Sequence, residues 1–205
     1  MLLPEQLFAF LVAAVLLTLA PGPDNLMVLG IGMARGRKPG IAFGVGCAAG
    51  CLSHTLLAAL GVGALIAASP QAFAALRIAG GLYLVWLGGK ALRSRGGRVA
   101  AAGGPESPRR LFLRGVLANA INPKVILFFL SFLPQFVVPA RGGVALQLAL
   151  LGVVFTVQSI VIFGLLGFFA GGVGEWLNAR PGVGAWLDRA SGLIFVALGV
   201  RLLFS

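Results

Sequence analysis

The sequence predicts an all-α integral membrane protein with six transmembrane helices. Of its 205 residues, 59% are hydrophobic and only 10% are charged, whereas soluble domains carry about 25% charged residues. The apolar residues gather into stretches that can cross a hydrocarbon layer of roughly 30 Å, which takes about 20 residues. This composition excludes an ordinary soluble enzyme, a disordered chain and a disulfide-rich secreted module.

Six apolar stretches follow one another along the chain. They cover residues 5–34, 40–68, 74–92, 111–137, 144–173 and 184–204. Prolines interrupt the first stretch at 21–24 and the fourth at 122–124. Proline inside a helix removes a hydrogen bond and clashes with the preceding turn, so we expect a broken helix at both places. The Gly-, Ala-, Pro- and Arg-rich segment 93–110 is predicted to be a flexible basic linker.

The net charge of +11 indicates orientation rather than binding to nucleic acid. Most of the 16 Lys and Arg residues lie in or beside the loops that follow the first, third and fifth stretches. Basic loops are retained on the cytoplasmic side of a membrane. We therefore expect a multi-pass protein of the bacterial cytoplasmic (inner) membrane, with the linker in the cytoplasm and both termini outside.

A sequence repeat divides the chain into two three-helix units, 1–92 and 111–205. Residues 81–90 (GLYLVWLGGK) resemble residues 192–201 (GLIFVALGVR). The broken first helices correspond as well, because a charged residue follows a proline in both. Units of three helices have opposite orientations in the membrane, and such inverted repeats recur in transporters, where matching interruptions mark the binding site.

The first interruption combines unwound backbone with an acid. Pro21, Gly22 and Pro23 break the helix, and Asp24 and Asn25 begin its second half. Ionisable residues inside a membrane are costly and usually functional. The alternative is a kinked helix that Asp24 merely caps.

The second interruption, Asn122-Pro123-Lys124, places a base within an apolar stretch. We expect Lys124 to face the protein interior, although a lysine side chain could also reach the interface. Asp24 and Lys124 would then offset each other's desolvation by pairing. Equally, they could separate when a zwitterion arrives, with Asp24 taking its ammonium group and Lys124 its carboxylate.

Other polar residues inside the stretches are weaker candidates. His54, the one histidine, titrates in a range that suits proton coupling, but a structural hydrogen bond explains it equally well. Gln158 and Asn119 are expected to join helices by hydrogen bonds. Cys47 and Cys51 are expected to pack, since two cysteines alone are too few for a metal site. No cofactor is expected.

The chain resembles the lysine exporter/homoserine–threonine resistance (LysE/RhtB) translocator family. The resemblance rests on the motif at 21–25, the basic segment 35–40 after it, and Asn119-x-x-Asn122-Pro123-Lys124. It implies a proton-driven exporter of amino acids or their derivatives, and not an enzyme. It also implies that 21–25 and 122–124 form the substrate and coupling elements.

Rival functions are transport of another small solute or of an inorganic ion, and a non-transporting membrane assembly module. An inorganic ion would require several carboxylates, and we identify Asp24 as the one acid well inside the stretches. Six short helices bury little surface, which favours a homodimer without establishing it.

Overall fold

The computed structural model describes residues 2–95, 99 and 106–204, and this part of the chain is helical without strands. Four single helices are long and apolar enough to cross a membrane. They are α3 (Arg37–Leu57), α5 (Pro70–Leu92), α8 (Val144–Phe168) and α10 (Pro181–Leu203). The prediction of an all-helical protein with membrane-length helices is confirmed.

The two remaining candidate spans are each made of two helices. The first joins α1 (Pro4–Leu19) to α2 (Pro23–Arg35) with a bend of 55°. The second joins α6 (Pro108–Ala120) to α7 (Pro123–Leu127), which continues in helical turns to Phe136, with a bend of 52°. Counting each bent pair as one span gives up to six spans, and both breaks fall at the predicted prolines.

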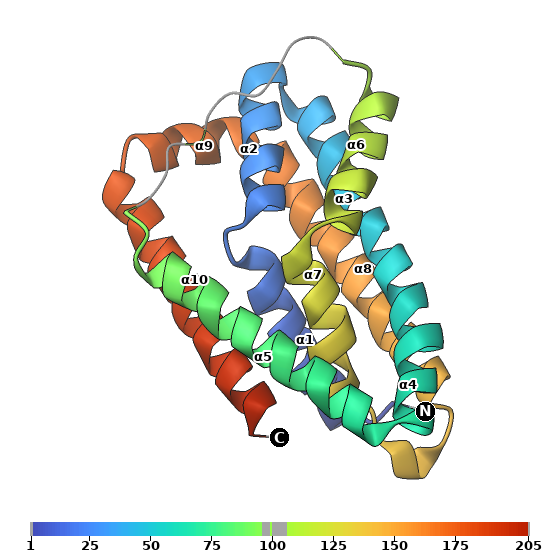
Figure 1. Ribbon diagram of the computed structural model, residues 1–205. Coiled ribbons are helices and arrows are strands. Elements are labelled where there is room, and N and C mark those ends of the chain that lie inside the picture. Colours follow the sequence, from blue (N-terminus) through green and yellow to red (C-terminus); the bar gives the residue numbers. More distant parts are fainter. Residues whose placement is uncertain (1, 96–98, 100–105, 205) are drawn as a thin grey trace.

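The boundary of the fifth predicted stretch is wrong. The apolar run 144–173 predicts one helix, but α8 ends at Phe168 and a separate short helix, α9 (Ala170–Asn178), follows. Figure 1 shows α9 running across the end of the molecule instead of continuing α8. Hydropathy did not reveal this turn because the residues on both sides of it are apolar or glycine.

Smaller differences concern the second and third stretches. After α3 the helix continues through a π-helical turn, Ala58–Val62, into α4 (Gly63–Ala68). The chain then turns into α5, whose first turn is capped by Ser69, since its Oγ accepts a hydrogen bond from the Ala72 amide at 3.2 Å. Half of the predicted linker, residues 96–98 and 100–105, lies outside the described residues.

Glycines let α3 pack closely against its two neighbours. A side chain at Gly46 would meet the Phe112 carbonyl of α6, and one at Gly40 would meet the backbone of Gly167 in α8. Cys47 and Cys51 are buried in the same helix. The glycines thus bring the helices together, and the burial of the two cysteines agrees with the packing role expected for them.

Helices α5 and α10 form a second closely packed pair (Figure 1). A Cβ atom placed on Gly81 would lie 3.1 Å from the Gly199 carbonyl, and one on Gly88 would lie 2.6 Å from the Gly192 carbonyl. The reverse contacts, from Gly199 to the Gly81 carbonyl and from Gly192 to the Gly88 carbonyl, are 2.7 and 2.8 Å. All four glycines belong to the repeated segments 81–90 and 192–201, so the repeated residues face each other across this pair.

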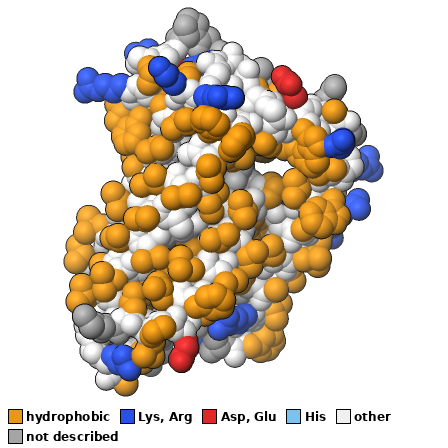
Figure 2. Space-filling view, turned by 180° about the vertical axis from the view of Figure 1, so that it is seen from behind, with side chains coloured by type: hydrophobic (Ala, Val, Ile, Leu, Met, Phe, Trp, Pro, Cys, Tyr) orange, Lys and Arg blue, Asp and Glu red, His pale blue; other side chains and the backbone are white. Residues whose placement is uncertain are grey.

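Charged residues gather at the two ends of the molecule. Figure 2 shows Lys and Arg side chains at both ends and a broad apolar surface between them. The end that carries α9, the start of α6 and the turn between α2 and α3 is called the basic end below. Here Glu106 binds Arg35 at 2.9 Å and also contacts Arg114. The hydrogen bond from Arg35 lowers the pKa of the Glu106 carboxyl. Both chain termini lie at the other end (Figure 1).

Candidate functional site

The two breaks have the same local construction. Pro23 and Pro123 each occupy the first turn of the second half-helix. Proline has no amide hydrogen, and a residue in the first turn of a helix does not use one in the helix. Asp24 and Lys124 come one residue later. A helix N-terminus favours an anion, so α2 stabilises Asp24, whereas Lys124 must find its stabilisation outside α7.

Lys124 finds that stabilisation at the end of α1. Its ammonium group donates to the carbonyls of Leu17, at 3.2 Å, and Ala20, at 3.1 Å. Leu17 lies in the last turn of α1 and Ala20 is its C-cap, where carbonyls lack helical partners and the helix dipole favours a cation. Lys124 is only 7% exposed. The prediction that this lysine faces the interior is therefore correct.

Gly22 makes room for this lysine. A Cβ atom at Gly22 would lie 3.0 Å from Lys124 Nζ. The break of the first span is thus filled by a charged side chain from the break of the second.

Asp24, in the first span, receives a hydrogen bond from the second span. Asn119, near the end of α6, donates from Nδ2 to Asp24 Oδ2 at 2.9 Å. The backbone carbonyl of Asn119 also lies 3.1 Å from His54 Nε2. A carbonyl only accepts, so Nε2 carries the proton in this contact. Asn119 therefore connects the two groups that the sequence nominates for proton coupling.

A second polar chain joins α1, α2 and α8. Asn25 donates to the Thr18 carbonyl at 2.9 Å, and Gln158 of α8 donates to Thr18 Oγ1 at 2.9 Å. Asn25 thereby satisfies one more carbonyl that the break leaves open. Gln158 joins helices as predicted.

Two cavities adjoin the breaks, and Lys124 lines both. The first, between α1, α3, α6 and α8, is bordered by Asp24 and Asn119 and has a volume of only about 10 Å³. A water needs roughly that much room, so this side is closed to an amino acid. The second lies between the breaks, α5 and α10 and holds about 430 Å³, within the roughly 300–1,000 Å³ typical of small-molecule sites.

The floor of the larger cavity offers hydrogen-bond donors. Asn122 borders it, is 4% exposed, and its Nδ2 has no partner. Lys124 has three N–H groups and uses two on α1. A ligand carboxylate would accept hydrogen bonds from Asn122 Nδ2 and from the third N–H group of Lys124. Apolar walls come from Leu26, Leu87 and Phe195.

Asp24 and Lys124 border the small cavity together without a direct ion pair. Asp24 takes its hydrogen bond from Asn119, and Lys124 donates to backbone carbonyls. The direct pairing expected from the sequence is therefore not seen, and separation of the two charges by a zwitterion stays a prediction. All the predicted residues, from 21–25 through His54, Asn119, 122–124 and Gln158, gather around the breaks.

One acid was missed. Asp188 lies in the second turn of α10 and borders the large cavity with Lys90. Asp188 lies near the start of the predicted stretch 184–204, so it does not contradict the interpretation of Asp24 as the one acid well inside the stretches. The signal was available, because Asp188 falls within the stretch 184–204. Within the described residues, no three His, Cys, Asp or Glu side chains lie close enough to hold a metal ion.

Comparison with known proteins identifies the family. The LysE type translocator family matches this chain over residues 15–205. The chain belongs to this family.

Several curated relatives of similar length carry functional names. A leucine efflux protein of Enterobacter sp. (strain 638) is 33% identical over 197 residues, covering 95% of this chain and 93% of the relative. A leucine efflux protein of Klebsiella pneumoniae is 34% identical over 202 residues, covering 94% and 92%. A homoserine/homoserine lactone efflux protein of Salmonella typhimurium is 31% identical over 199 residues, covering 97% and 96%. These relatives are transporters by name, not enzymes. No solved structure matches this chain.

Proposed function

We propose that this LysE-type translocator exports a zwitterionic amino acid or amino-acid derivative, driven by the proton gradient. The observation that carries the proposal is the meeting of the two breaks, where Lys124 of one span occupies the opened turn of the other. The named relatives support amino-acid export. The cavity of about 430 Å³ beside the breaks gives the substrate a place to bind.

The substrate carboxylate binds at the floor of the large cavity. Lys124 and Asn122 present donors at the cavity floor, and a charge-assisted hydrogen bond there is stronger than a neutral one. The apolar walls then contact the substrate side chain. Leucine and homoserine are the first candidates, because relatives are named for them.

The unequal cavities support alternating access. The large cavity reaches from the breaks towards the basic end, while the space between Asp24 and Lys124 on the other side is closed. Two inverted three-helix repeats would exchange these roles by moving against each other. The facing glycines of α5 and α10 support such a repeat, since the repeated segments pack reciprocally.

Protons couple at Asp24 or at His54. Both contact Asn119, so protonation of either group alters the same hydrogen-bond chain beside the substrate site. The positive-inside rule supports placing the basic end in the cytoplasm of a bacterium and both termini outside. Export then begins from the large cavity.

Counterflow in proteoliposomes tests the proposal. Vesicles loaded with unlabelled leucine or homoserine should accumulate the labelled amino acid, and an imposed pH gradient should change the extent of accumulation. Empty liposomes and the Lys124→Met variant are the controls. If neither amino acid, nor any member of a panel of the common amino acids, moves under any gradient, the export proposal is wrong.

A further inference from the structure

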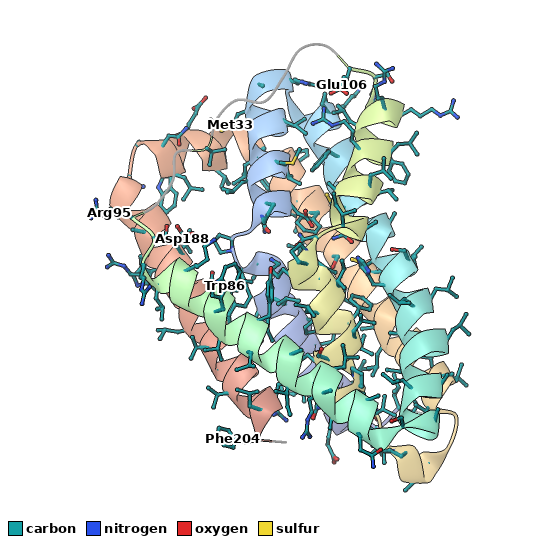
Figure 3. The ribbon with its side chains drawn as sticks, viewed as in Figure 1. Met33, Trp86, Arg95, Glu106, Asp188 and Phe204 are labelled. Atoms are coloured by element: carbon teal, nitrogen blue, oxygen red, sulfur yellow. The ribbon has the colours of Figure 1, made fainter. Side chains whose placement is uncertain are left out.

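The mouth of the large cavity carries an acid and a base that the binding site at its floor does not use. Asp188 of α10 and Lys90 of α5 line the cavity together with Ser94. Figure 3 places Asp188 beside the end of α5, between the middle of the molecule and the basic end. An acid partly buried on a membrane helix is costly and calls for a specific partner.

Asp188 retains capacity for a ligand. Ser94 Oγ donates to Asp188 Oδ2 at 2.5 Å, but a carboxylate can accept about four hydrogen bonds. Neither of the described ion pairs, both at Glu106, involves Asp188. Lys90 extends over the Trp86 ring, with Nζ 4.6 Å from the ring centroid, and is exposed.

Helix geometry places this charged mouth away from the floor. Asp188 precedes Phe195 by seven residues on α10, a rise of roughly 10 Å at 1.5 Å per residue. Phe195 is the wall residue next to the floor, with its ring 5.8 Å from Lys124 Nζ. Asp188 and Lys124 therefore lie at different depths of the cavity. The cavity therefore contains two separate polar regions.

Resting on the proposed function, we infer that Asp188 and Lys90 form an outer loading site, which binds the zwitterionic head of the amino acid before it reaches Lys124. Asp188 receives the ammonium group, and Lys90 receives the carboxylate. The outer site selects compounds that carry both charges, whereas the floor presents donors for the carboxylate.

The test compares transport from the side of the basic end, in vesicles that expose this end. Asp188→Asn should raise the KM for leucine roughly tenfold, the loss expected for one charge-assisted hydrogen bond, with kcat within about twofold of wild type. The matched control is Glu175→Gln, an exposed acid of α9 at the same end that does not line the cavity; its KM should not change.

Competing ligands separate recognition from a structural role. 4-Methylpentanoate, which is leucine without its amino group, should inhibit wild type poorly relative to leucine, and Asp188→Asn should lose this discrimination. Ser94→Ala removes the contact to Asp188 and should retain the discrimination. An equal loss in both variants would mean that Asp188 only ties α10 to the end of α5, and the inference would be wrong.

A second variant keeps the test decisive if Asp188→Asn folds poorly. Lys90→Gln should raise the KM for leucine and leave inhibition by leucinol, which lacks the carboxylate, unchanged. Wild-type transport with an unaltered KM in the Asp188 or Lys90 variant would overturn the loading site alone. Absence of transport by the wild type would instead overturn the proposed function.

Discussion

Lys124 explains at the level of one residue why a broken helix is stable inside a membrane. Breaking α1 from α2 leaves carbonyls without amide partners, and hydrocarbon offers no water to replace them. Lys124 satisfies two of these carbonyls and Asn25 a third. The same contacts give the buried ammonium group its hydrogen-bond partners. The broken helix thus offsets the free-energy cost of burying the lysine, and the lysine offsets the cost of the unpaired carbonyls.

Replacing Lys124 by Met should therefore harm both stability and transport. Each buried carbonyl that loses its partner costs about 1–3 kcal/mol, and under the proposed function the substrate carboxylate loses its cation. We expect a lower melting temperature in detergent and a counterflow rate reduced by more than about tenfold. Lys38→Met, at an exposed base beyond α2, is the control and should behave like wild type. Transport at the wild-type rate by Lys124→Met would remove this residue from the substrate site.

Gly22→Ala should separate function from folding. The added methyl group comes 3.0 Å from Lys124 Nζ, the movable end of a side chain, and the extended backbone at Gly22 accepts alanine. We expect a folded protein, with an unchanged melting profile, whose transport is slowed several-fold because the ammonium group is displaced. A fully active Gly22→Ala variant would show that the position of the ammonium group is not critical.

At the level of elements, close backbone contact decides which helices pack. Gly115 of α6 lies against the Phe43 carbonyl of α3, which a Cβ atom on Gly115 would overlap. Helical Gly→Ala substitutions normally gain up to about 1 kcal/mol. Overpacking against backbone costs about 1–3 kcal/mol, so the clash outweighs the gain at this crossing.

Gly115→Ala should thus destabilise the protein, whereas Gly164→Ala should not. A Cβ atom added to Gly164 of α8 would meet nothing within 4 Å, so alanine there keeps only the gain in helix propensity. Thermal unfolding of both purified variants in the same detergent makes the comparison. Equal melting temperatures for the two variants would contradict the proposed role of the α3–α6 crossing.

Local sequence signals predicted the elements well, and long-range packing explains what they missed. The breaks were predictable because Pro23 and Pro123 interrupt the helix in their own turn, independently of distant residues. Asp188 became a cavity residue only through the antiparallel register of α5 and α10, which no local pattern encodes. Likewise, the turn between α8 and α9 has no proline to mark it.

At the level of the whole molecule, charge distribution predicts the orientation. From the positive-inside rule we expect the basic end to lie in the cytoplasm. Arg141→Cys, at the opposite end, should react in intact cells with a membrane-impermeant maleimide, and Glu175→Cys should react only after permeabilisation. Both positions are exposed, and the two native cysteines are buried. The reverse pattern of labelling would invert the assigned topology and direct transport from the large cavity inward.

The division of the large cavity between two kinds of helix has a consequence for how such proteins diversify. Its charged floor comes from the broken spans, whereas Tyr83, Leu87 and Phe195 on its walls come from the unbroken α5 and α10. Substitutions on these walls would alter the accepted cargo without disturbing the carbonyl–ammonium contacts that hold the breaks. One transport mechanism would in this way serve relatives that carry apolar amino acids and relatives that carry hydroxylated ones.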